Sequence, residues 1–511
     1  MLAGRYLDGV ASRADVESLE EALATDDASR RLFIEWCELD SSLAALAARR
    51  LRPSVAAPPG RSRRRIGAIV MVLAASAVVV TFLRTQHGPV GASGDVSHYD
   101  ERTLPVVTVA TVRGDGGPDR DRAITPSTIR AGKGIALRAG SGADVQLTGD
   151  TVYGVSAIDE GALFVGSVFA RLRGPASRYS VTASNLRVAD RGTSFRVARL
   201  DDDLLSVTVL DGTAEVFSRV RLPLCYWSFD DLPSGPSVGR TSRDECSSIP
   251  AAPGPGAEVV EGIVGAGAVR FDNTPGAGLS VDGGLGEKVG EGLLSMRVGM
   301  TIEALFVSRW SAAEGDYDEI YRKEDGTCRV LLSFQNDGLS NAAFSDPPVV
   351  PGPCLSFGLH LGGVGYRELD MPLDGREGRP TVADLADGRP HHVVATYDSF
   401  SGAKAIAIDG VKRFEHVVPM GSLILCGGPE RAEIGNHRGL EPFTGVIDEV
   451  AIYDYPLTPA EIEDHFLKFR RGEPYVAPAS LGPEGRWRPI DRLASGESRT
   501  FNHRTAEASG R

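Results

Sequence analysis

A short acidic string is the first place where the residue types could do chemistry. Glu314, Asp316 and Glu319 follow the spacing Glu-x-Asp-x-x-Glu, and paired carboxylates on one strand can hydrolyse a glycosidic bond. A catalytic strand also needs apolar residues between its carboxylates, whereas Gly315 and Asp318 are typical of a loop. The string therefore predicts a solvated loop. We therefore expect no catalytic residues, and we expect that the chain is not an enzyme.

His391 and His392 are the other adjacent residues that could serve a chemical role. They stand at the beginning of an apolar run, and no cluster of Asp or His lies near them in the sequence. Metal sites need several such ligands together. The pair is therefore interpreted as the start of a strand.

An uncharged run at residues 66–83 gives the clearest signal for an element. Its eighteen residues would form a helix about 27 Å long, which just spans the core of a bilayer. Residues 49–65 before it contain seven Arg and no acid, and such clusters stay in the cytoplasm. We expect a single-pass protein of the inner (cytoplasmic) membrane, with its C-terminal ectodomain in the periplasm or at the cell surface.

The overall composition favours several folded domains. A chain of 511 residues is too long for one hydrophobic core, and 60 Gly and 31 Pro suit the many turns of β folds. The net charge of −13 leaves no surplus of Lys and Arg to neutralise phosphates. We therefore expect no direct nucleic-acid partner.

Residues 1–48 form a small acidic segment with helical periodicity. Four apolar residues recur at helical spacing and share one face: Leu32, Trp36, Leu39 and Leu43. So short a segment buries little surface, so this face packs internally or against a partner. The segment has four Arg against ten Asp and Glu, one cysteine and no His, so no zinc site is implied.

The same segment resembles a bacterial family. Residues 6–9, 19–23 and 26–33 are similar to the helical anti-sigma head of FecR-type transmembrane regulators. In that family the head holds an extracytoplasmic-function sigma factor, whose surface is basic. The resemblance implies a sigma factor as the cytoplasmic partner, and the acidic charge of the head is compatible with it.

Residues 104–218, after a linker at 84–103, alternate short β-rich runs with turn residues, which predicts a small β domain. Residues 206–210 and 213–217 flank Asp211-Gly212, a pair that favours a tight hairpin turn.

A signature within this segment also resembles the FecR domain. Residues 179–183 and 186–197 follow its order of strand, Gly-Thr-x-Phe step and strand. Gly192, Thr193 and Phe195 are interpreted as structural, with the glycine at a crowded backbone position and the phenylalanine in the core.

Residues 222–470 carry the most specific pattern in the chain. Strand patterns at 391–398 and 405–408 are followed by the turn pair Asp409-Gly410, and Thr458 and Pro459 predict the start of a helix. Together these segments resemble the laminin-G-like, concanavalin-A-like jelly roll. That resemblance implies a two-sheet sandwich that binds glycans or proteins, sometimes with calcium. Asp272, Asn273 and Asp448 are its candidate calcium ligands.

Five of the six cysteines fall in the expected ectodomain, where disulfides persist. Proximity in the sequence favours Cys225 with Cys246 and Cys328 with Cys354, although other pairings remain open. The polar residues 471–511 lack any apolar period, which predicts a disordered tail.

Two functions of different classes remain open at this stage. The order of head, arginine run, membrane helix and FecR-like domain favours a regulator that sequesters a sigma factor and senses a glycan or protein outside. The alternative is a surface module that binds polysaccharide or protein without a regulatory role. A surface glycoside hydrolase is a third, weaker interpretation, because it depends on the acidic string and the fold alone.

Overall fold

The computed structural model describes most of residues 106–508. The described residues are 106–108, 111–113, 122–124, 127–131, 135–174, 177–236, 241–326, 328–336, 344–476, 486–505 and 507–508. The predicted head, membrane segment and flanking linkers lie outside them, as do Leu32, Trp36, Leu39 and Leu43. No helix among the described residues combines the length and apolar character that a membrane span requires. Residues 101–511 form one compact unit.

Two β-sandwiches make up the described part of this unit, which confirms the expected mostly β fold. In the first sandwich, one sheet follows the order β1 (Val106–Thr108), β5 (Ile135–Arg138), β6 (Asp144–Leu147), β9 (Ser167–Arg171), β12 (Ser194–Arg199), β13 (Leu204–Asp211), β33 (Ser498–Asn502) and β34 (Glu507–Ala508). The other sheet follows the order β32 (Trp487–Ala494), β14 (Thr213–Arg219), β11 (Leu186–Arg191), β10 (Arg178–Ala183), β8 (Glu160–Val165), β7 (Thr151–Ala157) and β4 (Ser127–Ala131). Strands β2 (Thr111–Arg113) and β3 (Arg122–Ile124) pair with each other.

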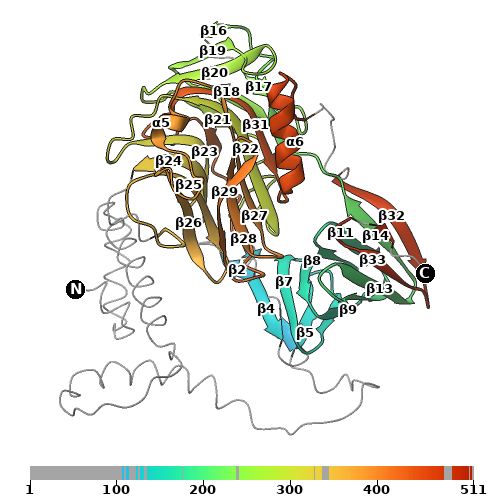
Figure 1. The fold of residues 1–511 in the computed structure, drawn as a ribbon. Coiled ribbons are helices and arrows are strands. Elements are labelled where there is room, and N and C mark those ends of the chain that lie inside the picture. Colours follow the sequence, from blue (N-terminus) through green and yellow to red (C-terminus); the bar gives the residue numbers. More distant parts are fainter. Residues whose placement is uncertain are drawn as a thin grey trace, which may run out of the picture. The chain divides into compact units, whose positions relative to one another are not determined.

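The C-terminal residues belong to this first sandwich, so the prediction of a disordered tail is wrong for them. Strand β32 pairs with β14, and β33 pairs with β13. In Figure 1 these red strands lie beside the green strands of residues about 290 positions earlier. Leu493 and Phe501 are buried in the core. The other side chains of β32 and β33 are exposed or half-buried, so the sequence of this segment lacks the apolar period that indicates a folded element.

The hairpin predicted at Asp211-Gly212 is also wrong. Strand β13 lies in one sheet and β14 in the other. Gly212 has a φ of +79°, as the turn chemistry predicts, but the chain crosses here between two sheets. The hydrogen-bonding partners that a hairpin would provide come from β33 and β32 instead.

Two of the three residues interpreted as structural are buried in the first sandwich. Phe195 is fully buried in its core, and the hydroxyl of Thr193 donates to the carbonyl of Thr213 at 2.9 Å. Gly192 is exposed rather than crowded. Its φ of +84° is nevertheless a backbone conformation that residues other than glycine adopt only at a cost in free energy.

The second sandwich is a two-sheet jelly roll. One sheet follows the order β16 (Gly235–Pro236), β19 (Ala257–Glu261), β20 (Gly267–Asp272), β31 (Thr444–Tyr453), β22 (Gly299–Ser308), β27 (His391–Asp398), β28 (Ala403–Ile408) and β29 (Val411–Val417), with β15 (Cys225–Trp227) also paired to β31. The other follows the order β17 (Ser242–Arg243), β18 (Pro250–Pro253), β21 (Leu279–Val281), β30 (Ala432–Ile434), β23 (Tyr317–Asp325), β24 (Cys328–Asn336), β25 (Pro353–Leu361) and β26 (Gly365–Pro372). The helices are α5 (Val382–Leu385) and α6 (Pro459–Arg470).

Two local predictions in the jelly roll are confirmed. Strands β27, β28 and β29 pair in succession, with positive φ angles at Asp409 and Gly410 in the second turn. Helix α6 begins as predicted, because Thr458 caps it in a capping box with Glu461 and Pro459 occupies the first turn.

A buried polar network joins helix α6 to the sheet that contains β22 and β27. Glu303 of β22 is fully buried. Its carboxylate accepts hydrogen bonds from His392 Nε2 at 2.7 Å, His465 Nδ1 at 3.0 Å and the hydroxyl of Tyr453 at 2.7 Å. Burial would raise the pKa of Glu303, but the charges and hydrogen bonds of His465 and His392 outweigh it and lower the pKa to about 2.

Candidate binding site on the jelly roll

The sheet that contains β24 has one apolar and one polar face. Successive side chains of a strand point to opposite faces. In β24, Val330, Leu332 and Phe334 belong to the hydrophobic core. Arg329 and Ser333 alternate with them and therefore lie on the outer face.

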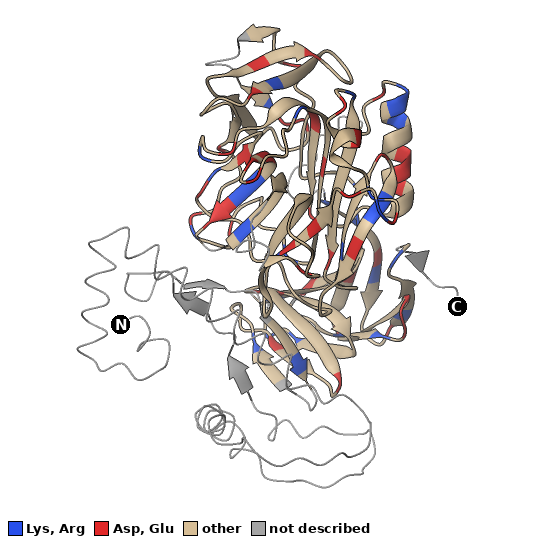
Figure 2. Cartoon of the chain, turned by 60° about the vertical axis from the view of Figure 1, so that its left-hand side comes forward, with Lys and Arg blue, Asp and Glu red and all other residues tan. Residues whose placement is uncertain are grey.

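Strand register lines up polar residues across this outer face. One row joins Glu433 of β30, Arg322 of β23 and, across β24 and β25, Glu368 of β26. A second row reads Glu319, Ser333, Ser356 and Asp370 across strands β23 to β26. We call this surface the polar face. Figure 2 shows acidic and basic residues close together on the strands of the jelly roll.

The guanidinium of Arg322 is the centre of an ion-pair network on the polar face. It lies 2.6 Å from Glu319, 2.7 Å from Glu324 and 2.9 Å from Glu441. Arg329 reaches the same Glu324 at 2.9 Å. Burial works against the charged form of Glu324, but the two guanidiniums prevail and lower its pKa to about 2. Glu324 is therefore held as an anion between two cations.

Glu319 corrects the expectation of a solvated acidic loop. It lies in strand β23 with 1% exposure, and burial raises its pKa well above the usual range, although Arg322 opposes the shift. Asp318 is buried as well, whereas Glu314 lies in the preceding turn. Strand β23 already begins at Tyr317, within the predicted loop, and the pairing of Arg322 with Glu319 allows this carboxyl group to be buried in the sheet.

A cavity of about 360 Å³ opens at the β30 end of the polar face. Its lining consists of Asp282, Leu285, Arg322, Glu324, Pro429, Glu430, Arg431, Glu433, His437 and Arg438. Glu433 accepts a hydrogen bond from the backbone N–H of Arg438 at 2.8 Å and interacts with His437 Nδ1 at 3.2 Å. The side chains of Arg431 and Arg438 are exposed. The cavity thus offers planar hydrogen-bonding groups of both charges at its wall and its rim.

Residues 344–346 cross the opposite end of the polar face. The ring of Phe344 packs on Tyr366 with centroids 5.7 Å apart, and the hydroxyl of Ser345 donates to Asp370. The backbone N–H of Asp346 donates to the carbonyl of Glu368 at 2.7 Å. Residues 344–346 thus cover part of this end, whereas the cavity opens at the β30 end.

The candidate calcium ligands are not brought together. Asp272 pairs with Thr444 at the start of β31, four residues from Asp448, which corresponds to about 13 Å along a strand. The carboxylate of Asp448 is buried and accepts the backbone N–H groups of Ile263 and Val264 at 2.8 and 3.1 Å. The predicted set is therefore wrong. Among the described residues no group of three His, Cys, Asp or Glu forms a metal-binding cluster.

Neither predicted disulfide is present. Cys225 and Cys246 are buried free thiols, and they belong to different hydrophobic clusters on opposite sides of strand β15. Cys354 pairs with Gln335, seven residues along β24 from Cys328, or about 23 Å. That separation is far beyond the reach of a disulfide.

The sequence contains one signal for the polar face that none of the motifs above includes. Strands β24 to β26 alternate polar and apolar residues, and this period shows which residues share a face. Residues that pair across β23 and β30 are over a hundred positions apart in the chain, so the cavity itself has no local signal.

Residues 336–463 match a protein family described as the concanavalin A-like lectin/glucanases superfamily. This match and the two-sheet architecture identify a concanavalin A-like jelly roll in the chain. No curated protein matches the chain significantly.

Several solved structures are distantly similar. Domain 4 of an extracellular arabinanase from Geobacillus stearothermophilus, solved with arabinotriose, is 17% identical over 47% of this chain and 97% of that one, with a TM-score of 0.30. The binding domain of Paraclostridial Mosquitocidal Protein 1 is 12% identical over 43% and 47%, with a TM-score of 0.32. A candidate anti-sigma factor from Parabacteroides distasonis is 24% identical over 18% and 47%, with a TM-score of 0.16. None of these likenesses is close enough to transfer a function.

Proposed function

We propose that the jelly roll binds a surface polysaccharide through the cavity at the β30 end of the polar face. The observation that carries this proposal is the cavity lining itself. Guanidiniums can donate to the hydroxyls and ring oxygens of a sugar, and carboxylates can accept from its hydroxyls. A protein segment rich in polar side chains is the alternative ligand, because it offers the same groups.

Binding without turnover is part of the proposal. Glycoside hydrolysis needs two carboxyl groups facing one bond. Glu319 is buried under Arg322, and Glu324 is held between Arg322 and Arg329. Burial keeps Glu319 away from a ligand, and Glu324 is already paired with two guanidiniums, which supports binding without hydrolysis. We expect no release of reducing ends from any polysaccharide that binds.

The test uses rim residues whose removal leaves the buried network intact. Arg431→Ala and Arg438→Ala should each weaken polysaccharide binding several-fold, because each removes an exposed donor. Lys412→Ala is the matched control, since Lys412 is an exposed cation on β29 of the other sheet. Binding to a glycan array and to candidate surface proteins would be measured for each variant. If Arg431→Ala and Arg438→Ala both bind as tightly as the unaltered chain and the Lys412→Ala control, the cavity is rejected as the site.

We further propose that this module belongs to a membrane-anchored regulator. The sequence order of acidic head, arginine run and apolar segment supports a single-pass topology and a sigma-factor partner. Residues 1–65 should resist protease added outside spheroplasts. They should also recover a sigma factor from cytosol, less so with Trp36→Ala, because the change removes the largest side chain of the apolar face. Cleavage within residues 1–65 would contradict the topology, and recovery of no sigma factor would contradict the partner.

A further inference from the structure

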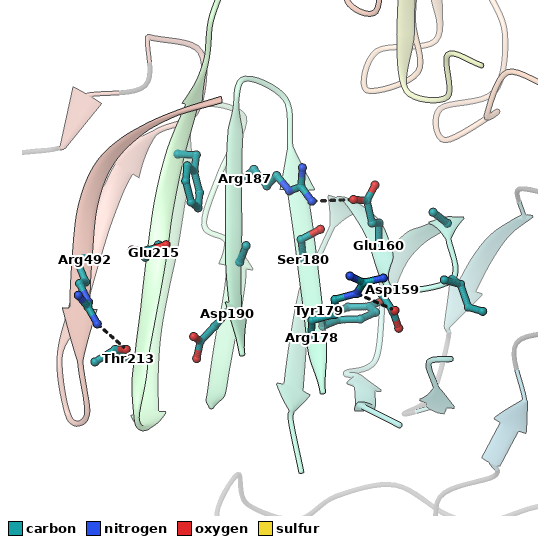
Figure 3. Close-up of a pocket in the computed structure, with 14 residues that line it drawn as sticks. Asp159, Glu160, Arg178, Tyr179, Ser180, Arg187, Asp190, Thr213, Glu215 and Arg492 are labelled. Atoms are coloured by element: carbon teal, nitrogen blue, oxygen red, sulfur yellow. Dashed lines mark hydrogen bonds and ion pairs between the residues drawn. The ribbon is translucent and has the colours of Figure 1, made fainter. Parts of the chain in front are cut away.

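The outer face of the second sheet of the first sandwich carries a groove of about 660 Å³ (Figure 3). Its volume lies within the range of small-molecule sites, about 300 to 1,000 Å³. The register places one row of groove residues across five strands: Arg492 of β32, Glu215 of β14, Ala189 of β11, Ser180 of β10 and Glu160 of β8. Strand β32 comes from the C-terminal segment, so the groove is complete only when this segment is in place.

The groove is hollow because the middle of this row is small. Ala189 and Ser180 lie side by side on β11 and β10, and neither side chain extends far above the sheet. Phe217 and Arg187, which face each other across β14 and β11, form the next row and one wall. The small side chains of the central row, next to the larger side chains of the neighbouring row, therefore leave a trough on the surface of the sheet.

Charged and polar groups surround the trough. Arg187 lies 2.6 Å from Glu160 and Arg178 lies 3.5 Å from Asp159. Figure 3 shows the Arg187–Glu160 pair beside Ser180. Each pair occupies part of a planar group, which leaves further N–H donors and carboxylate lone pairs for a ligand.

Ser180 provides an independent sign of a ligand. The residue is 4% exposed at the floor of the trough. Its Oγ is buried and has no hydrogen-bond partner among the described residues. A buried hydroxyl without a partner costs free energy, and a ligand that hydrogen-bonds to it would recover that cost.

The balance of charges indicates the class of ligand. Three Arg and four Asp or Glu line the groove, so the site does not favour a strongly charged ligand of either sign. The backbone of its central strands is already paired on both sides, which excludes addition of a peptide strand within the groove. The partly exposed ring of Phe217 is an apolar platform beside these polar groups. A ligand with many hydroxyls and an apolar C–H face fits this combination.

We propose that this groove is a second binding site, specific for a neutral saccharide, on the first sandwich. It shares no residue with the jelly-roll cavity. The two sites can therefore be tested separately, and this proposal stands whether or not the jelly roll binds polysaccharide.

The experiment is a calorimetric titration of the solubilised full-length chain with each of three neutral trisaccharides: maltotriose, cellotriose and mannotriose. Ala189→Tyr should fill the trough, and Glu215→Gln removes a carboxylate from the same row. We expect saturable binding of at least one trisaccharide by the unaltered chain, and at least about a tenfold loss in Ala189→Tyr, which is about 1.4 kcal/mol. Circular dichroism and thermal unfolding would show whether each variant is folded. If Ala189→Tyr does not fold, Glu215→Gln still tests the groove.

Two control variants separate this groove from the jelly-roll cavity and from nonspecific binding. Arg196→Ala removes an exposed cation from β12 in the opposite sheet, and Arg438→Ala alters the jelly-roll cavity. Arg196→Ala should not change trisaccharide binding, whereas any binding that Arg438→Ala weakens belongs to the jelly-roll cavity and not to this groove. The proposal is overturned if no neutral trisaccharide binds, if only acidic trigalacturonate binds, or if folded Ala189→Tyr and Glu215→Gln both bind as tightly as the unaltered chain.

Discussion

Phe501 in the C-terminal strand β33 provides a direct test of how the first sandwich is built. Its side chain is 1% exposed and belongs to the same core cluster as Phe195, and its backbone pairs with Leu205. Truncation of a buried Phe to Ala costs about 3–5 kcal/mol. Since domains are stable by about 5–15 kcal/mol, Phe501→Ala should remove a large part of the stability of this sandwich.

Thermal unfolding of residues 101–511 measures this effect. A domain of about 150–250 residues loses about 2–4 °C in melting temperature per kcal/mol, so we expect a decrease of about 6–20 °C in the transition of the first sandwich. Arg488→Ala is the matched control, because Arg488 is exposed on β32 and surface changes usually stay within about 0.5 kcal/mol. A Phe501→Ala shift no larger than that of the control would falsify the assignment of the C-terminal strands to this core.

Two further predictions concern buried groups of the jelly roll. The pKa of Glu303 is lowered to about 2 from 4.5, so its contribution to stability, about 3 kcal/mol, is present above pH 4.5 and is lost as the pH falls toward 2. In Glu303→Gln the denaturation midpoint should be lower at pH 7 and fall less steeply below pH 4.5; equal slopes for both proteins would contradict the role of Glu303. Burial raises the pKa of the Cys246 thiol to about 12 and that of Cys426 to about 11, so both should react with a thiol reagent at pH 8 only in denaturant, as counted by mass spectrometry. Fast labelling of the native chain at Cys246 or Cys426 would argue against their burial.

Local chemistry explains which elements were predictable. The turn at Asp409-Gly410 and the cap of α6 at Thr458 depend on neighbouring residues, and both predictions are confirmed. The crossing at Gly212 depends on pairing with β32 and β33, almost three hundred residues later. Tight-turn chemistry suits a hairpin and a sheet crossing equally, so the sequence around Gly212 cannot separate them.

The burial and pairing of the charged side chains were the least predictable properties of the candidate site. The sequence predicts a solvated loop for Glu314 and Glu319, because Gly315 and Asp318 are typical of a loop and interrupt the apolar pattern of a strand. The partner that permits the burial of Glu319 is Arg322, three residues along the same strand. Glu441, another carboxylate of the network, and Glu433, the neighbour of Arg322 on β30, come from segments that only the folded sheet brings near.

The jelly roll has two covalent attachments to the first sandwich, because the chain leaves from β14 and returns into β32. These strands are direct neighbours, with Arg219 opposite Trp487. A single protease cut within the jelly roll therefore releases nothing, since each fragment remains joined to the same sheet through its own strand. A pulling force on a ligand bound to the jelly roll is likewise divided between two adjacent strands, because the jelly roll is attached to the first sandwich at both of its ends.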